Sequence, residues 1–233
     1  MRVHVLQHVP FEGIGCMASW LESRDAEVTY TRFYEVDDLP VVAGFDLIIV
    51  MGGPMNVSDE SVHTWMKGEK SFVREAMEAG ISVLGVCLGA QIIADVMGAR
   101  IFSNAYKEIG WFSIEAVEGG ESTFTFPERL MAFHWHGDTF DLPETAVLLA
   151  RSEGCTNQAF QVGKKVIGLQ FHLETTMETT ELMIENCPDN LLNGRYVQSV
   201  VAMRKSTEAN SKIANRLLFA MLDYLTSDLG QDT

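Results

Sequence analysis

Apolar runs about as long as a β-strand recur along this chain and limit the folds open to it. Four of them read RVHVL (2–6), LIIVMGG (47–53), ISVLGV (81–86) and KVIGLQF (165–171). The last two are almost continuously apolar or β-branched, which is typical of strands buried on both faces of a parallel sheet. Such strands require helices on both sides of the sheet.

Apolar residues at helical spacing mark three segments between and after these runs, 14–23, 65–79 and 207–226. The apolar stripe of the last segment is predicted to consist of Ile213, Leu217, Ala220, Met221 and Leu225. Residues 100–162 are predicted to form short strands and turns. The alternation of strands and helices predicts an α/β fold, a doubly wound and mainly parallel central sheet in a flavodoxin-like three-layer arrangement.

We expect a single domain over residues 1–233, because the sequence holds no repeat, no low-complexity tract and no Pro/Gly-rich linker. Its core is predicted to span about 1–175, followed by a helical C-terminal extension over 176–233. The composition, 47% hydrophobic and 21% charged, is that of an ordinary globular protein and permits a core of the usual size.

Charge and motif content argue against several classes of function. The net charge of −15 and the lack of a basic stripe argue against a nucleic-acid partner. No run of 18 apolar residues suggests a membrane span, and the N-terminus is too short and polar for a secretory signal. The cysteines Cys16, Cys87, Cys155 and Cys187 are too irregularly spaced for a zinc site or a disulfide framework. A cytoplasmic, reduced protein is therefore expected.

The segment GVCLG places Cys87 where a predicted strand meets a predicted helix, with Gly85 and Gly89 on either side. This pattern has the form of a nucleophile elbow with cysteine in place of serine. A helix N-terminus favours a thiolate, so we expect a lowered pKa for Cys87, and the N–H of Leu88 is placed to stabilise an oxyanion. A buried structural cysteine is the alternative, and it is favoured for the other three cysteines.

A nucleophilic thiol needs a base, and the base needs a group that orients it. His172 follows the buried run 165–171, so it is expected at the same sheet edge as Cys87. Glu174 lies two residues further on and points to the same side in extended chain. Cys87, His172 and Glu174 together form a candidate catalytic triad, although an isolated H-x-E is more often a pair of solvent-facing polar residues.

Taken together, GVCLGAQ (85–91) and GLQFHLE (168–174) resemble the class I, triad-type glutamine amidotransferase domain. The stretch 132–160, with its H-G-D, is similar to the corresponding region of the glutaminase domain of GMP synthetase. MGGPMNVSDE (51–60) resembles the glycine turn of this family, and KEIGW (107–111) its E-x-G segment. The resemblance runs from about residue 44 to residue 175.

The resemblance implies hydrolysis of the side-chain amide of glutamine. Cys87 would attack the amide, release ammonia and form a γ-glutamyl thioester, which water then hydrolyses. His172 would act first as base and then as acid, with Glu174 behind it. The oxyanion would be bound by the N–H of Leu88 and by an N–H in the Gly52–Gly53 turn, where glycine permits close approach of the backbone.

Three further residues match positions that lie beside the glutamine pocket in this family. Gln91 matches the glutamine of C-x-G-x-Q, and His136 and Asp138 match H-x-D. An exposed or purely structural role is the alternative for each. His134 and His136 lie on one face of an extended segment, but no further ligand supports a metal site there. Neither a metal nor another cofactor is expected.

The sequence departs from the family pattern at Leu173, where the usual H-P-E motif has proline, and this substitution is expected to loosen the turn. The nucleotide-binding synthetase half of GMP synthetase is absent, so a separate synthetase protein would accept the ammonia. A free-standing γ-glutamyl hydrolase with the same triad is the second hypothesis. A non-catalytic regulatory or binding domain is the third, and the presence of all three triad residues disfavours it.

Overall fold

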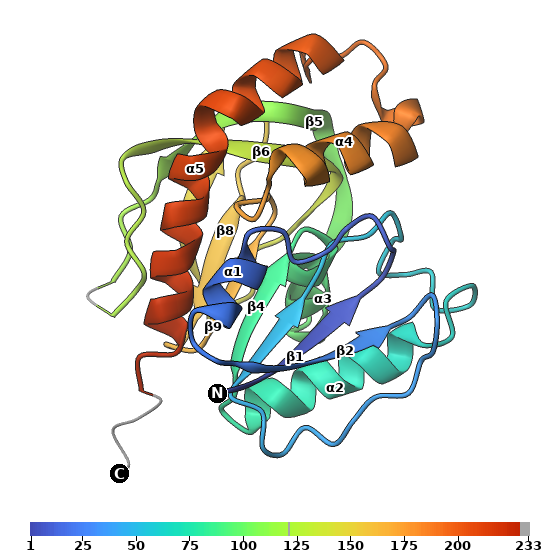
Figure 1. Cartoon of the computed structure of the whole chain (residues 1–233), viewed down its shortest axis with the longest axis vertical. Helices are drawn as coiled ribbons and strands as arrows, with labels where there is room; N and C mark the ends of the chain where they lie inside the picture. Colours follow the sequence, from blue (N-terminus) through green and yellow to red (C-terminus); the bar gives the residue numbers. More distant parts are fainter. Residues whose placement is uncertain (121, 229–233) are drawn as a thin grey trace.

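A mixed sheet runs through the centre of the molecule in the computed structural model, which describes residues 1–120 and 122–228 (Figure 1). Over these residues the sheet contains ten strands in the order β10-β5-β7-β8-β9-β4-β3-β1-β2, with β6 paired to β5. The parallel half consists of β2 (Glu27–Arg32), β1 (Arg2–Gln7), β3 (Leu47–Val50), β4 (Ser82–Val86) and β9 (Val166–Leu169).

The other half of the sheet is largely antiparallel. It consists of β8 (Ala159–Val162), β7 (Val147–Ser152), β5 (Ile101–Ala116), β6 (Arg129–Phe140) and the short β10 (Tyr196–Val197), which runs parallel to β5. The segment 100–162 was expected to form short strands, and this expectation is wrong for β5 and β6. These two strands form a long ribbon, interrupted by a bulge between Ser103 and Glu108. Polar residues interrupt the apolar pattern of both strands, so the sequence does not indicate their full length.

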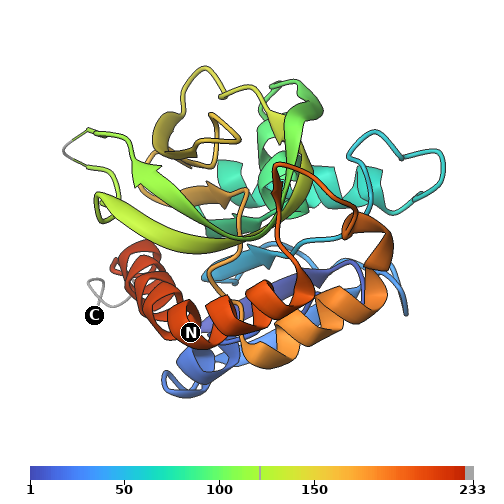
Figure 2. The ribbon, with the colours of Figure 1, turned by 90° about the horizontal axis from the view of Figure 1, so that it is seen from above.

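Helices cover both faces of the sheet, as predicted (Figure 2). On one face lie α1 (Met17–Glu22) and α5 (Val200–Leu225), with α4 (Met177–Asn186) packed against α5 and followed by the 3₁₀ turn η1 (Pro188–Asn190). On the other face lie α2 (Met66–Glu78) and α3 (Leu88–Val96). Each face has its own core because the central strands are apolar on both sides.

The C-terminal helix α5 differs from its predicted form. It begins at Val200, where the Ser199 hydroxyl accepts the N–H of Ala202 as an N-terminal cap. Its buried stripe consists of Met203, Thr207, Ala214, Leu218, Met221, Leu222 and Leu225. Ile213 and Ala220 were predicted to lie on this stripe, but Ile213 is 56% exposed and Ala220 is exposed as well. The helix contacts α4, β5 and β6 as well as α1, so its contact face follows these neighbours.

The parallel register brings three strand ends to one edge of the sheet. Val50 of β3 pairs with Gly85 of β4, and Val86 pairs with Leu169 of β9. The residues that follow these strands, including Gly52 and Cys87, therefore leave the sheet at the same edge, where ligands bind in open α/β sheets. Over residues 1–120 and 122–228, no helix is both long and apolar enough to cross a membrane.

Candidate active site

Cys87 occupies the sharp corner between β4 and α3. Its backbone has φ +52° and ψ −106°, a conformation that residues other than glycine rarely adopt. The corner needs its two glycines, because a Cβ on Gly85 would lie 2.6 Å from the carbonyl of Gly89, and one on Gly89 would collide with the carbonyl of Val50. The N–H of Leu88, at the start of α3, points to the Cys87 sulfur.

Burial raises the pKa of the Cys87 thiol, although His172 and the N–H of Leu88 both act to lower it. The lowered pKa that the helix N-terminus led us to expect is therefore wrong. The reason is desolvation, since the residue is only 6% exposed. The protonated thiol donates to the carbonyl oxygen of Trp135 at 3.8 Å. To react as a nucleophile, this thiol would need a nearby base to take up its proton.

His172 is held beside Cys87 by its backbone and by Glu174. Its N–H donates to the carbonyl of Phe133 at 2.7 Å, just beyond the end of β9. Its Nδ1 donates to Oε1 of Glu174 at 2.7 Å, and both side chains are buried. A carboxylate in this position fixes the tautomer that turns Nε2 towards the thiol.

Burial by itself lowers the pKa of His172, but Glu174 and Cys87 raise it well above its ordinary value. Nε2 faces the thiol of Cys87, and within the described part of the chain it makes no hydrogen bond of standard geometry. Catalytic contacts of this kind often tighten only when substrate binds. The pair is therefore poised to form a thiolate and an imidazolium.

The turn after β3 places Gly52 and Gly53 opposite the start of α3. A Cβ on Gly52 would collide with Oε2 of Glu12 and would lie 3.3 Å from Cε1 of His172. A Cβ on Gly53 would lie 2.9 Å from Cβ of His8 and 3.1 Å from Cδ2 of Leu88. A side chain at position 53 would therefore press against His8 and Leu88, whereas one at position 52 would have to displace the Glu12 carboxylate.

A cavity of about 280 Å³ opens in front of Cys87. Its walls are formed by Glu12, Gly53, Pro54, Met55, Cys87, Gln91, Lys107, Ile109, Trp135, His136, Gly137, Asp138, Cys187 and Asn190. The residues predicted from C-x-G-x-Q and H-x-D thus lie around one cavity with the thiol. Gln91 is also linked to Cys87 through Gln170. Nε2 of Gln91 donates to Oε1 of Gln170 at 3.1 Å, and Nε2 of Gln170 lies 3.7 Å from the Cys87 sulfur.

The residues of the H-x-D segment are held by several hydrogen bonds. Nδ1 of His136 donates to the backbone carbonyl of Asp138 at 3.0 Å. The Asp138 carboxylate accepts from Nδ2 of Asn56 at 2.8 Å and from the hydroxyl of Ser103 at 3.0 Å. These contacts join the turn after β3, strand β5 and strand β6. Both residues therefore brace the cavity as well as lining it.

Comparison with known proteins identifies the family to which this chain belongs. The family model described as "Glutamine amidotransferase class-I" matches residues 16–190. The chain is 34% identical to the glutamine amidotransferase-like protein YfeJ of Salmonella typhimurium, over 97% of this chain and 98% of that protein. The chain belongs to the class I glutamine amidotransferases.

Two further relatives support the assignment. The chain is 28% identical to one subunit of the glutamine-hydrolysing GMP synthase of Picrophilus torridus, over 66% of this chain and 81% of that relative. The crystal structure of a glutamine amidotransferase from Thermotoga maritima superposes with a TM-score of 0.87 at 31% identity, covering 97% of this chain and 98% of the other. The predicted fold class is thereby confirmed.

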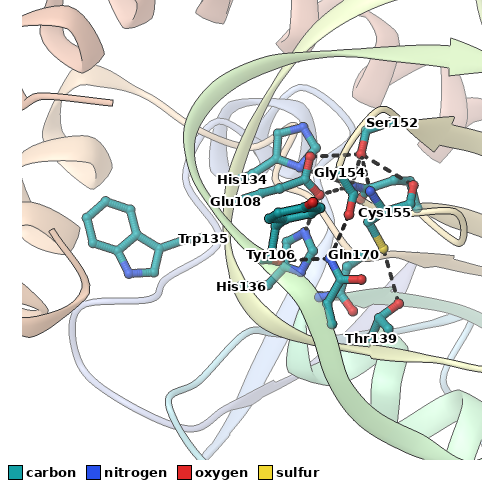
Figure 3. A network of polar contacts seen from close by, with 12 residues as sticks. Tyr106, Glu108, His134, Trp135, His136, Thr139, Ser152, Gly154, Cys155 and Gln170 are labelled. Atoms are coloured by element: carbon teal, nitrogen blue, oxygen red, sulfur yellow. Dashed lines mark hydrogen bonds and ion pairs between the residues drawn. The ribbon is translucent and has the colours of Figure 1, made fainter. Parts of the chain in front are cut away.

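A buried polar network lies behind the H-x-D segment of this class I amidotransferase (Figure 3). Glu108 on β5 accepts from the hydroxyl of Ser152 at 2.8 Å and from Nε2 of Gln158 at 2.7 Å, and its Oε2 lies 3.2 Å from Nε2 of His136. Burial by itself would raise the pKa of Glu108, but His136, His134 and Ser152 lower it. Figure 3 shows Trp135 pointing away from this network.

The network adds a carboxylate that the sequence reasoning did not include. One ligand atom from each of Glu108, His134 and His136 lies within 4.8 Å of the others. Both oxygens of Glu108 already accept hydrogen bonds from protein groups, and desolvation lowers the pKa of His134 to about 3. The group is best described as a hydrogen-bonded brace behind the cavity wall.

Glu12 is a residue of the site that the sequence reasoning missed. It follows β1, lines the cavity and is 8% exposed. Burial raises its pKa, although His172 and His8 act in the opposite direction. The available signal was a carboxylate in the stretch VPFEG, within the loop that follows a buried parallel strand at its carboxyl end. Lys107, on the wall of the same cavity, was also missed.

Proposed function

We propose that this amidotransferase hydrolyses the side-chain amide of glutamine with Cys87 as nucleophile, His172 as acid and base, and Glu174 as the orienting carboxylate. The observation that supports this most directly is the 2.7 Å contact between His172 and Glu174 beside a cysteine held at φ +52°. A nucleophile, its base and the group that orients the base are the elements of a triad.

The first half of the reaction forms a thioester. The thiol of Cys87 transfers its proton to Nε2 of His172 and attacks the δ-carbon of glutamine. The negative charge on the carbonyl oxygen is stabilised by the N–H of Leu88 and by an N–H of the Gly52–Gly53 turn. When the tetrahedral intermediate collapses, the C–N bond breaks, and the leaving nitrogen takes the proton from His172 and departs as ammonia.

The second half hydrolyses this γ-glutamyl thioester. His172 removes a proton from water, which attacks the same carbon, and the C–S bond breaks to release glutamate. The sulfur leaves as thiolate and regains its proton from His172, so that the site returns to its starting state. Neither step requires a metal ion or an organic cofactor.

The cavity suggests how the amino-acid end of glutamine is held. Lys107 offers an ammonium for the α-carboxylate, while Asp138 and Glu12 offer carboxylates for the α-ammonium group. Gln91 and His136 provide further polar atoms on the walls. This distribution of charge fits a small zwitterion whose side chain reaches Cys87.

The ammonia is proposed to pass to a separate synthetase partner. Support comes from the Picrophilus torridus relative, whose name identifies it as one subunit of a glutamine-hydrolysing synthase. The test measures glutamate released by the purified chain from glutamine and from a panel of γ-glutamyl peptides. Slow, Cys87-dependent release from glutamine alone is expected. Faster release from the peptides would contradict the synthetase role and identify a free-standing γ-glutamyl hydrolase.

A further inference from the structure

A second buried histidine–carboxylate pair lies directly behind the glycine turn. Nε2 of His8, just after β1, is 2.7 Å from Oε1 of Glu69 in the first turn of α2, and neither side chain is exposed. The imidazole ring stacks on Phe33 with centroids 5.5 Å apart and an angle of 14° between the planes, and it also contacts Trp65. The ring is therefore fixed in one orientation.

The other nitrogen of the same ring contacts the glycine turn. Nδ1 of His8 lies 3.0 Å from the carbonyl oxygen of Gly52. A carbonyl oxygen can only accept, so Nδ1 must donate. Burial alone lowers the pKa of His8, but the charge of Glu69, its hydrogen bond, the Gly52 carbonyl and Glu12 together raise it. With an ionised Glu69, both ring nitrogens donate and His8 is an imidazolium.

The contact with Gly52 also determines where the next N–H points. In a trans peptide the C=O of one residue and the N–H of the next point in opposite directions. Because the Gly52 carbonyl is directed to His8, the N–H of Gly53 is directed away from His8. Gly53 lines the cavity with Cys87, and a Cβ at Gly53 would touch Leu88. This orientation allows the Gly53 N–H to face the cavity in front of Cys87.

We propose that the Glu69–His8 pair is a positioning device that orients the Gly52–Gly53 peptide so that the Gly53 N–H becomes the second donor of the oxyanion hole. This inference rests on the proposed hydrolysis at Cys87. It names the N–H of Gly53 as the donor within the turn, and it gives the buried Glu69–His8 pair, which lies outside the triad, a role in catalysis. His8 precedes the segment 16–190 that the family model matches.

A purely stabilising role explains the pair poorly. Removing two charges from water costs free energy that their attraction only partly returns, and well-packed apolar residues often stabilise as much or more. Here the ion pair is enclosed by Phe33 and Trp65, which are compatible with an apolar side chain at position 8. What an apolar side chain cannot supply is the hydrogen bond to Gly52.

The test compares two variants in a Glu69→Gln background, so that no unpaired buried charge remains in either. His8→Phe fills the aromatic pocket but has no donor for Gly52. His8→Asn carries an amide nitrogen close to the position of Nδ1 and can still donate. Two rates are measured for each variant: kcat for glutamine, and alkylation of Cys87 by iodoacetamide, which needs the thiolate but no oxyanion hole.

His8→Phe is expected to lower kcat by about 10²-fold, which is the lower end of the effect of removing one oxyanion donor. KM and the alkylation rate are expected to change little. His8→Asn should recover much of this loss. Equal losses of kcat in the two variants would overturn the proposal, because they would show that the donor to Gly52 is irrelevant. A parallel loss of alkylation would also overturn it, since the damage would then extend to the thiol itself.

A crystal structure of the His8→Phe variant tests the same inference without any activity. The Gly52–Gly53 peptide is expected to reorient once its carbonyl has lost its donor, whereas the His8→Asn variant should keep the original orientation. An unchanged peptide in the His8→Phe variant would refute the positioning role even if the chain proved not to hydrolyse glutamine. The crystal structure therefore tests the positioning role of His8 independently of whether the chain hydrolyses glutamine.

Discussion

Asn215 on the C-terminal helix α5 holds the backbone of Leu173, the residue between the two polar members of the proposed triad. Its Nδ2 donates to the carbonyl oxygen of Leu173 at 2.7 Å and to that of Thr175 at 3.0 Å. The Leu173 side chain is fully buried in the core. The turn that a proline would stiffen is thus braced from α5, and this contact acts against the loosening expected from leucine.

Replacing Asn215 with alanine is expected to remove the amide donor from the carbonyls of Leu173 and Thr175, and to leave Leu173 with only the weak thiol donor of Cys16 among the described residues. The free energy of unfolding should fall by roughly 1–3 kcal/mol, and kcat should fall by about tenfold as the His172–Glu174 segment loses its fixed geometry. Urea unfolding and glutamate release measure the two effects. Asn210→Ala is the matched control, because among residues 1–120 and 122–228 Nδ2 of Asn210 bonds only to the carbonyl of Ser206 on the same helix. Equal effects in both variants would contradict the bracing role.

Cys87 is expected to be the cysteine that a glutamine-mimicking diazo-ketone labels. Burial raises the pKa of Cys16 to about 12 and that of Cys187 to about 11. The Cys87 thiol is also buried, but His172 is in position to remove its proton. Peptide mass spectrometry after labelling identifies the modified residue. Labelling of Cys187, which lines the same cavity, would show that the reactive end of the substrate lies elsewhere.

Glu174→Gln is expected to lower kcat/KM by about 10²-fold, towards the lower end of what general acid–base catalysis contributes. The change should also move the alkaline limb of the pH profile to lower pH. The negative charge of Glu174 stabilises the His172 imidazolium and so raises its pKa, and a neutral amide removes that stabilisation. An alkaline limb at an unchanged pH would exclude Glu174 as the partner of the catalytic base.

The contribution of the His8–Glu69 pair to stability should depend on pH. The pKa of folded His8 is raised above its ordinary value of 6.5, so the stabilisation is fully present below that value and is lost as pH rises through the folded pKa. Glu69→Gln should therefore cost about 1–3 kcal/mol near pH 6 and progressively less at higher pH.

Urea unfolding of both proteins across this pH range measures the difference in stability. A difference that grows with rising pH would contradict the raised pKa of His8. Lys70, the next residue on α2, pairs with Glu60 and Asp95 at a more exposed position. Lys70→Met is therefore a control for the loss of a nearby ion pair, and its effect should vary little over the same range because the pKa of lysine lies far above it.

The sequence alone determined β1, β3, β4 and β9 of the parallel half and the approximate position of the candidate triad, whereas the largely exposed edge strand β2 was not expected. Continuous apolar runs require burial on both faces, and a parallel sheet brings the ends of its strands to one edge. The comparisons confirm the fold and the family. The roles of Cys87, His172 and Glu174 remain predictions, supported by the geometry described above.

Only the tertiary structure decided what surrounds these residues. His8 and Glu12 follow β1 whereas Glu69 lies on α2, and no local pattern marks their meeting behind the glycine turn. The apolar face of α5 and the support of Leu173 by Asn215 also depend on how that helix crosses the sheet. The physical reason is the same in each case. Periodicity and motif spacing record contacts along one element, whereas desolvation, pKa values and the bracing of loops arise from groups that only folding brings together.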